Sequence, residues 1–441
     1  MRPLLILACL VAGPAQAAPR LLVPADLGAP APAPVVVAGV GPGATVTITT
    51  ERRAREGGQT FVGEATYTAD RAGRVDTAVA SARAGTYAGA DPLGPFWSAR
   101  PRSARADDPA SGQVRVTASV GGAAVATAVI RVAPDPATFV ASTDTPFPGA
   151  IWARPRASGR HPVVIVLGGS EGGGSTARAM APLFAARGYA TLGLPYYDPG
   201  YDPTDRIEGL PRSFTDIPVD RLAAVRAWLA TRDDADPGRI AIWGVSKGAE
   251  FALIAASRYR WVRAVIAVVP SDLVWEGWGR AGPATASFAF AGKPLAFQPY
   301  DGMAAELAKA ARGEPMDLRR VHLAGRAAHP GRVAAARIPV ERFQAKLLLI
   351  AGGRDQVWPS AEMARNIIAT RRRAGLDTTA VIEADANHFL GGPGTDPVAP
   401  LVTPGSDGAA IARARTAGWR ATFDLLARTI GSGARTPGRP S

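Results

Sequence analysis

Short apolar runs alternate with helix-like stretches along the chain from about residue 151 onward. The runs have the length of strands, are rich in Val, Ile and Leu, and are bounded by Gly or Pro, which is typical of strands buried on both faces. The predicted strands cover residues 163–167, 190–194, 240–243, 264–269, 347–351 and 378–382. Helices are predicted between them, for example over 218–231, and at the end over 409–430. This alternation predicts a mostly parallel sheet flanked by helices.

The N-terminal part has a different pattern, in which apolar and polar residues alternate over short segments. Val114, Val116 and Val120 alternate with polar residues, and a turn at Gly121 and Gly122 leads into a second strand-like segment. This pattern predicts a hairpin with one buried face. Further short strands are predicted over 35–37, 45–50 and 64–68. We therefore expect an immunoglobulin-like β-sandwich over residues 18–135 and an α/β domain over 136–430, with a connection at 134–148.

The two ends of the chain are expected to lie outside these domains. Residues 1–17 combine a basic start, an apolar run and the small residues Ala15 and Ala17, as secretory signal peptides do. We expect cleavage after Ala17 and export to the periplasm or the medium; a lipid anchor on Cys9 is the alternative. The apolar run is far shorter than the roughly 18 residues that a spanning helix needs, so no integral membrane span is expected. The tail, 431–441, is expected to be disordered.

The composition narrows the possible partners. A content of 47% hydrophobic and 20% charged residues favours globular domains with large cores. The formal net charge is +13, but the basic residues are dispersed arginines and only four lysines, without a basic run, so no nucleic-acid partner is expected. A role of this charge in attracting anionic substrates stays open. The single cysteine lies in the leader, and no metal or nucleotide motif is present, so no cofactor or metal is expected.

The pattern G-x-S-x-G occurs twice, at 244–248 and at 168–172. The later match lies between a predicted strand and a predicted helix, as the nucleophile elbow of an α/β hydrolase requires, because flanking glycines avoid clashes in this tight turn. We therefore predict Ser246 as the nucleophile. The earlier match continues into a glycine-rich loop and suits an oxyanion loop better.

The transition-state oxyanion is expected to be held by two backbone N–H groups. One is the N–H of Lys247, directly after the nucleophile, and the other comes from the earlier loop at Gly169 or Ser170. The alternative for that loop is a plain glycine-rich turn or an anion-binding helix N-terminus.

Histidine is scarce enough to narrow the choice of the general base. Of the four histidines, His388 alone follows a credible acid, in the order Ser, acid, His. Asp355 follows the strand predicted at 347–351, where sheet active sites collect, and is the favoured acid. Asp385 and Glu383 are the rival acids, but their closeness to His388 in sequence makes their approach to its far ring nitrogen awkward.

A long excursion over about 271–337 breaks the alternation of strands and helices. Several aromatic residues gather there among Gly and Pro. We predict that Trp275, Trp278, Phe288 and Phe290 line an acyl pocket as a lid above the active site; ordinary packing is the equal alternative.

Several strings together resemble the acyl-CoA thioesterase and bile acid-CoA:amino acid N-acyltransferase family. These are GVSKGAE at 244–250, LGGSEGG at 167–173, GGRDQVW at 352–358, ANHF at 386–389, and the segment 85–98 in the N-terminal domain. The resemblance covers nearly the whole chain after the leader. It implies Ser246, Asp355 and His388 as a triad, and an acyl thioester or ester as the small-molecule substrate. Conjugating members are expected to carry Cys at the elbow, so Ser favours hydrolysis.

Three functions are open at this point. The first is a serine hydrolase of acyl thioesters or esters, the second an exported carboxylesterase or dienelactone-type hydrolase acting on small oxygen esters, and the third a non-catalytic exported binding protein. A binding protein would be expected to have a broken triad, whereas all three members are present here.

Overall fold

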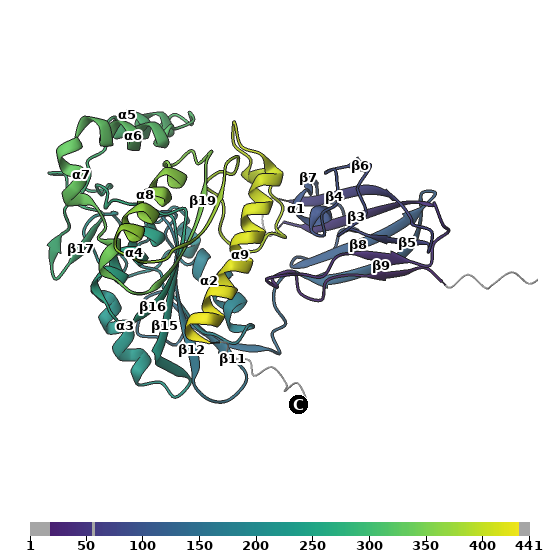
Figure 1. Ribbon diagram of the computed structural model, residues 1–441, viewed down its shortest axis with the longest axis horizontal. Coiled ribbons are helices and arrows are strands. Elements are labelled where there is room, and N and C mark those ends of the chain that lie inside the picture. Colours follow the sequence, from purple (N-terminus) through teal and green to yellow (C-terminus); the bar gives the residue numbers. More distant parts are fainter. Residues whose placement is uncertain (1–17, 55–57, 432–441) are drawn as a thin grey trace, which may run out of the picture. The chain divides into compact units, whose positions relative to one another are not determined.

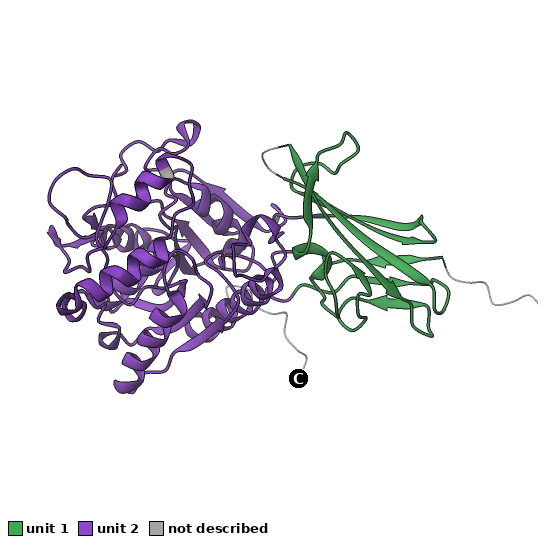
Figure 2. Ribbon diagram, turned by 90° about the horizontal axis from the view of Figure 1, so that it is seen from above, with its two compact units in different colours: residues 1–25, 32–130 green, residues 26–31, 131–441 purple. Residues whose placement is uncertain are grey.

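The computed structural model describes residues 18–54 and 58–431. The predicted signal peptide and all but the first residue of the predicted tail lie outside this range. Contacts divide these described residues into two compact units, one formed by those up to Ala25 and by Pro32–Ile130, the other by Asp26–Ala31 and those from Arg131 onward (Figure 2).

The first unit is a sandwich of two antiparallel sheets. One sheet has the order β1-β2-β5, and the other the order β6-β4-β3-β8-β9, with β7 paired to β4. The strands are β1 (Arg20–Leu22), β2 (Val36–Ala38), β3 (Thr45–Arg53), β4 (Gln59–Thr68), β5 (Arg74–Asp76), β6 (Ala84–Gly85), β7 (Arg100–Ser103), β8 (Gln113–Val120) and β9 (Ala123–Arg131). From Val46 to Thr50 in β3 and from Val114 to Ala118 in β8, every second residue is buried, as expected where one face of a sheet covers a core.

The segment 85–98 of this unit makes its polar contacts inside the sandwich. It contains the single helical turn α1 (Gly94–Trp97). The hydroxyl groups of Tyr87 and Tyr67 are hydrogen-bonded, and the Trp97 indole N–H donates to Asp91. A Cβ added at Gly94 would lie 2.2 Å from the Tyr87 ring. These contacts identify the segment as part of the packing of the first unit.

The second unit is built on an eight-stranded sheet with the order β10-β11-β13-β12-β15-β16-β19-β20. All neighbours from β13 to β20 are parallel. The parallel strands are β12 (His161–Leu167), β13 (Ala190–Gly193), β15 (Ala235–Val245), β16 (Val262–Val268), β19 (Lys346–Gly352) and β20 (Thr379–Glu383). Each of them overlaps one of the predicted strands.

The edge strand of this sheet and the strand next to it were not predicted. β10 (Phe139–Ser142) and β11 (Ile151–Pro155) pair antiparallel, and β11 pairs antiparallel with β13. The expectation of a plain connection over 134–148 is therefore wrong, since it contains β10. An edge strand is partly exposed and needs no long apolar run, so its pattern is weak; two residues of β10 are exposed and two are half-buried.

Helices cover both faces of this sheet (Figure 1). One face packs against α3 (Arg221–Ala230), α4 (Lys247–Arg258) and α8 (Ser360–Arg373), which share a core cluster with inward residues of the strands. The other face packs against α2 (Ser175–Ala185) and α9 (Gly408–Ile430), where Phe184, Trp419 and Phe423 form an aromatic cluster beside Trp243. This is the layered architecture of an α/β hydrolase.

The excursion between β16 and β19 has its own small elements. It contains β17 (Phe288–Phe290), β18 (Lys293–Pro294), α5 (Met303–Ala311), α6 (Leu318–Ala328) and α7 (Pro330–Ala336), followed by the short turn η2 (Val340–Arg342). β17 pairs with β18 and with β14 (Ile217–Pro218), so the excursion is joined to the chain just before α3.

Residues Asp26–Ala31 belong to the second unit, although they precede most of the sandwich in sequence. Leu27 is buried, and its carbonyl accepts a hydrogen bond from Thr395 Oγ1 at 2.8 Å. The Gly28 carbonyl accepts one from the Trp419 indole at 2.8 Å. The predicted single domain boundary at 135/136 does not anticipate this segment, because these two contacts are made across 368 and 391 positions of sequence.

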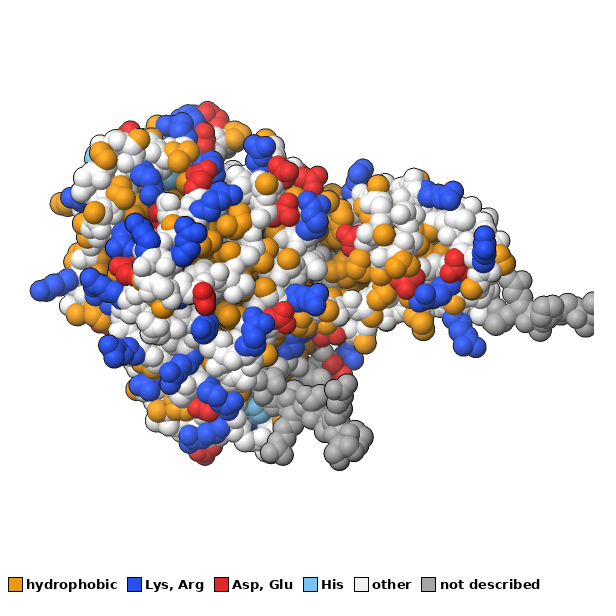
Figure 3. Space-filling model, viewed as in Figure 1, with side chains coloured by type: hydrophobic (Ala, Val, Ile, Leu, Met, Phe, Trp, Pro, Cys, Tyr) orange, Lys and Arg blue, Asp and Glu red, His pale blue; other side chains and the backbone are white. Residues whose placement is uncertain are grey.

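The basic side chains are scattered over the described surface. Figure 3 shows the Lys and Arg side chains spread over the visible face, interspersed with Asp and Glu. In the described ranges, no helix is long and apolar enough to cross a membrane. Within the same ranges, no group of three or more His, Cys, Asp or Glu residues is placed to hold a metal ion.

Candidate active site

Ser246 lies in a strained turn between β15 and α4. Its φ of 55° and ψ of −121° are unusual for a residue with a side chain, and such backbone strain is concentrated at functional sites. A Cβ at Gly244 would lie 2.2 Å from the Gly248 carbonyl oxygen, and one at Gly248 would lie 2.4 Å from the Leu167 carbonyl oxygen. Both glycines are therefore required by close backbone approaches, as the sequence pattern predicts.

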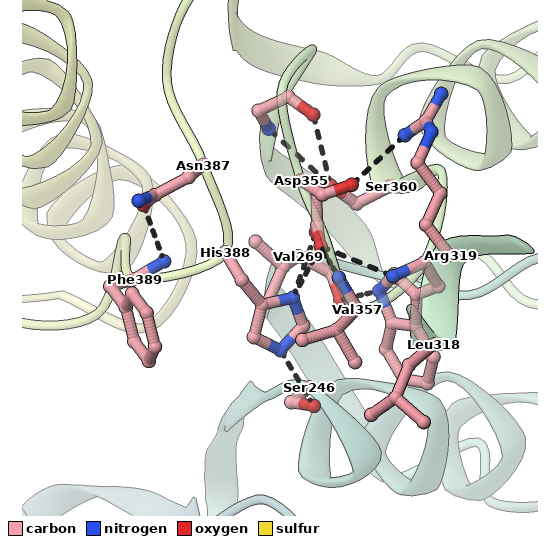
Figure 4. A network of polar contacts seen from close by, with 12 residues as sticks. Ser246, Val269, Leu318, Arg319, Asp355, Val357, Ser360, Asn387, His388 and Phe389 are labelled. Carbon is pink, nitrogen blue, oxygen red and sulfur yellow. Dashed lines mark hydrogen bonds and ion pairs between the residues drawn. The ribbon is translucent and has the colours of Figure 1, made fainter. Parts of the chain in front are cut away.

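Ser246, His388 and Asp355 form a continuous hydrogen-bonded chain (Figure 4). His388 Nε2 is 3.0 Å from Ser246 Oγ, and His388 Nδ1 is 2.9 Å and 2.8 Å from the two carboxylate oxygens of Asp355. Because a carboxylate oxygen accepts, Nδ1 carries the proton, and Nε2 is left as the acceptor that faces the serine hydroxyl. This is the arrangement that general-base activation of a serine requires.

The Asp355 carboxylate is fully buried and held in place by the backbone. Its Oδ1 accepts hydrogen bonds from the N–H groups of Val357 at 2.9 Å and Trp358 at 3.2 Å. Arg319 of α6 donates to the Asp355 carbonyl oxygen at 3.1 Å. The acid is thus oriented by its own loop and by the excursion. The rival acids point elsewhere, since Asp385 pairs with Arg354 and Glu383 pairs with Arg413.

The loop that carries His388 is fixed by its neighbour Asn387. The buried Asn387 amide donates to the Leu401 carbonyl oxygen at 2.7 Å, and its oxygen accepts from the Phe389 N–H at 3.1 Å. This loop approaches the end of β19 closely, because a Cβ on Gly352 would lie 2.4 Å from the carbonyl oxygens of both Ala386 and Asn387.

The two predicted sources of oxyanion N–H groups lie next to the serine. Lys247 is the first residue of α4, so its N–H has no acceptor within the helix. Gly169 is also close, since a Cβ there would lie 3.1 Å from Ser246 Cβ. The Gly169 N–H, however, donates to Glu171 Oε1 at 2.9 Å in this structure, which departs from its predicted role. Ser170 lines the cavity beside the serine.

A cavity of about 650 Å³ opens onto Ser246 and His388. This volume lies in the range of about 300–1,000 Å³ that is usual for small-molecule sites. Most of its lining is aromatic or aliphatic. Those residues are Tyr201, Val245, Trp278, Tyr300, Met303, Leu307, Met316, Leu318, Val357, Trp358, Phe389 and Leu401. Polar lining residues besides the serine and the histidine are Ser170, Glu171, Lys247, His322 and Arg415.

His322 lines this cavity but has a different environment from His388. Its Nδ1 lies 2.7 Å from the Leu318 carbonyl oxygen, and its ring packs edge-on against Trp275 and Trp358. Burial lowers the pKa of His322 to about 3, so its imidazole is neutral at working pH. No carboxylate is hydrogen-bonded to the His322 ring in the described contacts, so His322 differs from His388 in this respect.

Family models match both parts of the chain. The model described as acyl-CoA thioester hydrolase/BAAT N-terminal region matches residues 30–129, and the model described as BAAT/acyl-CoA thioester hydrolase C terminal matches residues 223–403. The chain belongs to the acyl-CoA thioesterase/BAAT family. The model of the dienelactone hydrolase family also matches the chain, over residues 149–291.

Curated relatives are similar at low identity. Mitochondrial acyl-coenzyme A thioesterase 2 of Homo sapiens is 24% identical over 48% of this chain and 44% of its own length, and acyl-coenzyme A thioesterase 6 of Mus musculus is 28% identical over 46% and 48%. Acyl-coenzyme A thioesterase 1 of Homo sapiens is 23% identical over 69% of each chain. This family member thus spans less than half the length of the first two relatives.

Solved structures are similar at still lower identity. A putative dienelactone hydrolase from Klebsiella pneumoniae is 16% identical, with a TM-score of 0.42, over 66% of this chain and 99% of that one. A puromycin-hydrolyzing peptidase from Mycobacterium tuberculosis is 14% identical, with a TM-score of 0.42, over 89% of this chain and 54% of that one.

Three of the four predicted substrate-binding aromatics of this thioesterase-family chain do not line the cavity. Trp278 does. Trp275 is fully buried, with its indole N–H bonded to Ser271 Oγ at 2.9 Å, and Phe288 is fully buried in the core cluster. Phe290 packs against that cluster and lies under the guanidinium of Arg258. The predicted roles of these three are wrong, because clustered aromatic residues in a long excursion also supply its own core.

The sequence analysis did not identify most of the residues that line the cavity. Met303 and Leu307 of α5, together with Met316 and Leu318 around the start of α6, come from the later part of the excursion. The available signal was the amphipathic pattern of these two short helices, which places apolar residues on one face.

Replacing Gly352 with Ala tests how strongly the acid and histidine loops depend on close approach. The added Cβ would collide with two backbone carbonyl groups, so His388 must shift, and a displacement of about 1 Å can cost about 100-fold in rate. We expect kcat/KM for a p-nitrophenyl ester to fall by about that factor. Gly331→Ala is the matched control, because a Cβ there meets nothing within 4 Å. Equal activity of both variants would contradict the role of Gly352.

Proposed function

We propose that this chain hydrolyses acyl thioesters or esters through a covalent acyl-enzyme at Ser246. The observation that carries the proposal is the hydrogen-bonded chain from Ser246 through His388 to the buried Asp355, opening into an apolar cavity. Its relatives, which are named acyl-coenzyme A thioesterases, support the same reaction class.

The geometry leads to a specific sequence of steps. His388 Nε2 accepts the hydroxyl proton as Ser246 Oγ attacks the acyl carbonyl carbon, and Asp355 stabilises the resulting imidazolium. The Lys247 N–H donates to the tetrahedral oxyanion, with a second N–H from Ser170, since the Gly169 N–H is donated to Glu171. His388 then protonates the departing thiolate or alkoxide. A water molecule, deprotonated by His388, releases the acid and restores Ser246.

The cavity favours an apolar acyl group. Trp278, Met303, Leu307 and Met316 would hold an alkyl chain by burying it, at a gain of about 0.8 kcal/mol for each methylene group removed from water. A second candidate is a dienelactone-type hydrolase or carboxylesterase of small oxygen esters, which the dienelactone hydrolase match favours. The leaving group distinguishes the two functions.

Export of the chain is a separate part of this proposal. The sequence pattern of residues 1–17 supports export. Export would separate the enzyme from the intracellular coenzyme A pool. When the full chain is expressed in a bacterial host, we expect the exported protein to begin at Ala18, as measured by intact mass. Ala17→Leu should retain the leader, because the cleavage site needs a small residue. A cell-internal protein that keeps Met1 in both variants would contradict export.

The nucleophile is tested with a panel of acyl-CoA thioesters and p-nitrophenyl esters from acetyl to palmitoyl. We expect Ser246→Ala to lower kcat by on the order of 10⁶, since removal of a triad nucleophile removes the whole unit. Ser257→Ala, on the same helix, is the control and should retain activity; its hydroxyl donates only to the Ile254 carbonyl oxygen. A fluorophosphonate probe should label the control but not Ser246→Ala. Turnover by Ser246→Ala at the control's rate would refute the mechanism.

A larger side chain at the exposed rim of the cavity tests whether the acyl chain of the substrate binds there. Met316 lines the cavity and is 41% exposed, whereas Leu323 is similarly exposed on the adjoining helix but does not line it. We expect Met316→Trp to lower kcat/KM for palmitoyl substrates at least about tenfold relative to acetyl substrates, because a hydrophobic pocket discriminates by about 1–3 kcal/mol per group. Leu323→Trp should leave the ratio unchanged. The same ratio in both variants would place the acyl chain elsewhere.

A further inference from the structure

Lys247 has a buried side chain in addition to its candidate oxyanion N–H. The residue is 2% exposed, and its Nζ donates to Glu250 Oε2 at 2.6 Å and to Ser287 Oγ at 2.9 Å. The rings of Phe214 and Phe288 face the ammonium group, each with its centroid 5.3 Å from Nζ, and the Trp278 centroid lies at 5.7 Å. An ammonium group at such a depth needs this degree of compensation.

The ion pair is deeply buried on both sides. Burial lowers the pKa of Lys247 and raises the pKa of Glu250, while the opposite charge of each partner counteracts both shifts. A pair of this kind is seldom a net source of stability, because apolar residues of similar volume often replace it without loss. We therefore examine which neighbouring segments the Lys247–Glu250 pair holds in position.

The network connects the nucleophile helix to the excursion. Glu250 Oε1 accepts the Trp275 N–H at 3.2 Å, and Ser287 Oγ lies 2.9 Å from the Trp275 carbonyl oxygen. Both contacts fix the segment that carries Trp278. The Trp278 ring stacks on Phe214 with centroids 4.5 Å apart and lines the cavity.

We propose that Lys247 is a positioning residue whose buried ammonium group, held by Glu250 and Ser287, fixes its own backbone N–H beside Ser246 and holds the Trp278 wall against the same site. This inference rests on the proposed hydrolase function and deepens it. One residue then couples the oxyanion site to the acyl pocket. Through its N–H, Lys247 acts on the transition state, since an oxyanion donor acts on charge that only develops there. Through the Trp278 wall it acts on binding of the acyl chain as well.

The decisive variant is the double replacement Lys247→Met with Glu250→Leu. It removes both charges together, so the fold keeps its stability while the directional hold on the elbow is lost. We expect kcat on p-nitrophenyl acetate to fall about 10- to 100-fold, since misplacing an oxyanion donor costs up to about 10²–10³ in rate. KM for p-nitrophenyl palmitate should rise, because the Trp278 wall is no longer held in place. Ser287→Ala, which keeps the ion pair, should lower kcat less.

The control is an exposed ion pair of the same fold. Arg337 and Glu341 pair at 2.8 Å near the surface, and their replacement by Met and Leu should leave kcat and KM unchanged. Unfolding temperatures of all variants establish that they are folded. An unchanged kcat in the folded Lys247→Met, Glu250→Leu variant overturns the positioning role.

The rate of fluorophosphonate labelling at Ser246 makes the test independent of the substrate. Phosphonylation builds charge on an oxygen at the same N–H groups, so labelling should slow by a similar factor in the double variant. Equal labelling rates in the double variant and the wild type overturn the inference. If the wild type labels rapidly but hydrolyses no panel substrate, the proposed substrate class fails, while the labelling comparison still decides the role of Lys247.

Discussion

The arrangement of the site depends on the hydrogen bond between the buried Asp355 carboxylate and His388. The carboxylate accepts two backbone N–H groups of its own loop and the Nδ1–H of His388, so it joins the end of β19 to the loop after β20. An unpaired carboxylate at this depth would be strongly unfavourable, and the imidazole is the partner that compensates for it. The same bond fixes the tautomer of His388 and directs Nε2 toward Ser246.

Close backbone contacts make this convergence possible. Gly244 and Gly248 allow the strained turn at Ser246, and Gly352 allows the histidine loop to lie against the end of β19. A parallel sheet brings the carboxyl ends of its strands to one edge, but only glycine at these points lets three loops meet within hydrogen-bonding distance. The distances between the side chains of Ser246, His388 and Asp355 therefore depend on how closely the backbone packs at these three glycines.

The excursion between β16 and β19 serves the site in two ways. Arg319 of α6 donates to the Asp355 carbonyl oxygen, and Trp275 bonds through its N–H to Glu250 on the nucleophile helix. The excursion is thus attached at both the acid loop and the elbow, while its later helices supply the apolar cavity wall. Its aromatic residues divide accordingly, with Trp275 and Phe288 in the core and Trp278 at the cavity.

The sequence by itself determined the features that depend on local geometry. Buried strands have apolar runs, the elbow needs glycines around Ser246, and the scarcity of histidine left His388 as the candidate base; the parallel sheet and the converging triad follow from these. Only the tertiary structure decided which aromatic residues face the cavity, that Glu171 accepts the Gly169 N–H, that the weak edge strand β10 joins the sheet, and that residues 26–31 pack with the second unit. These outcomes depend on contacts between distant segments, and a periodic pattern reports only that a residue is apolar, not which of two apolar environments will surround it.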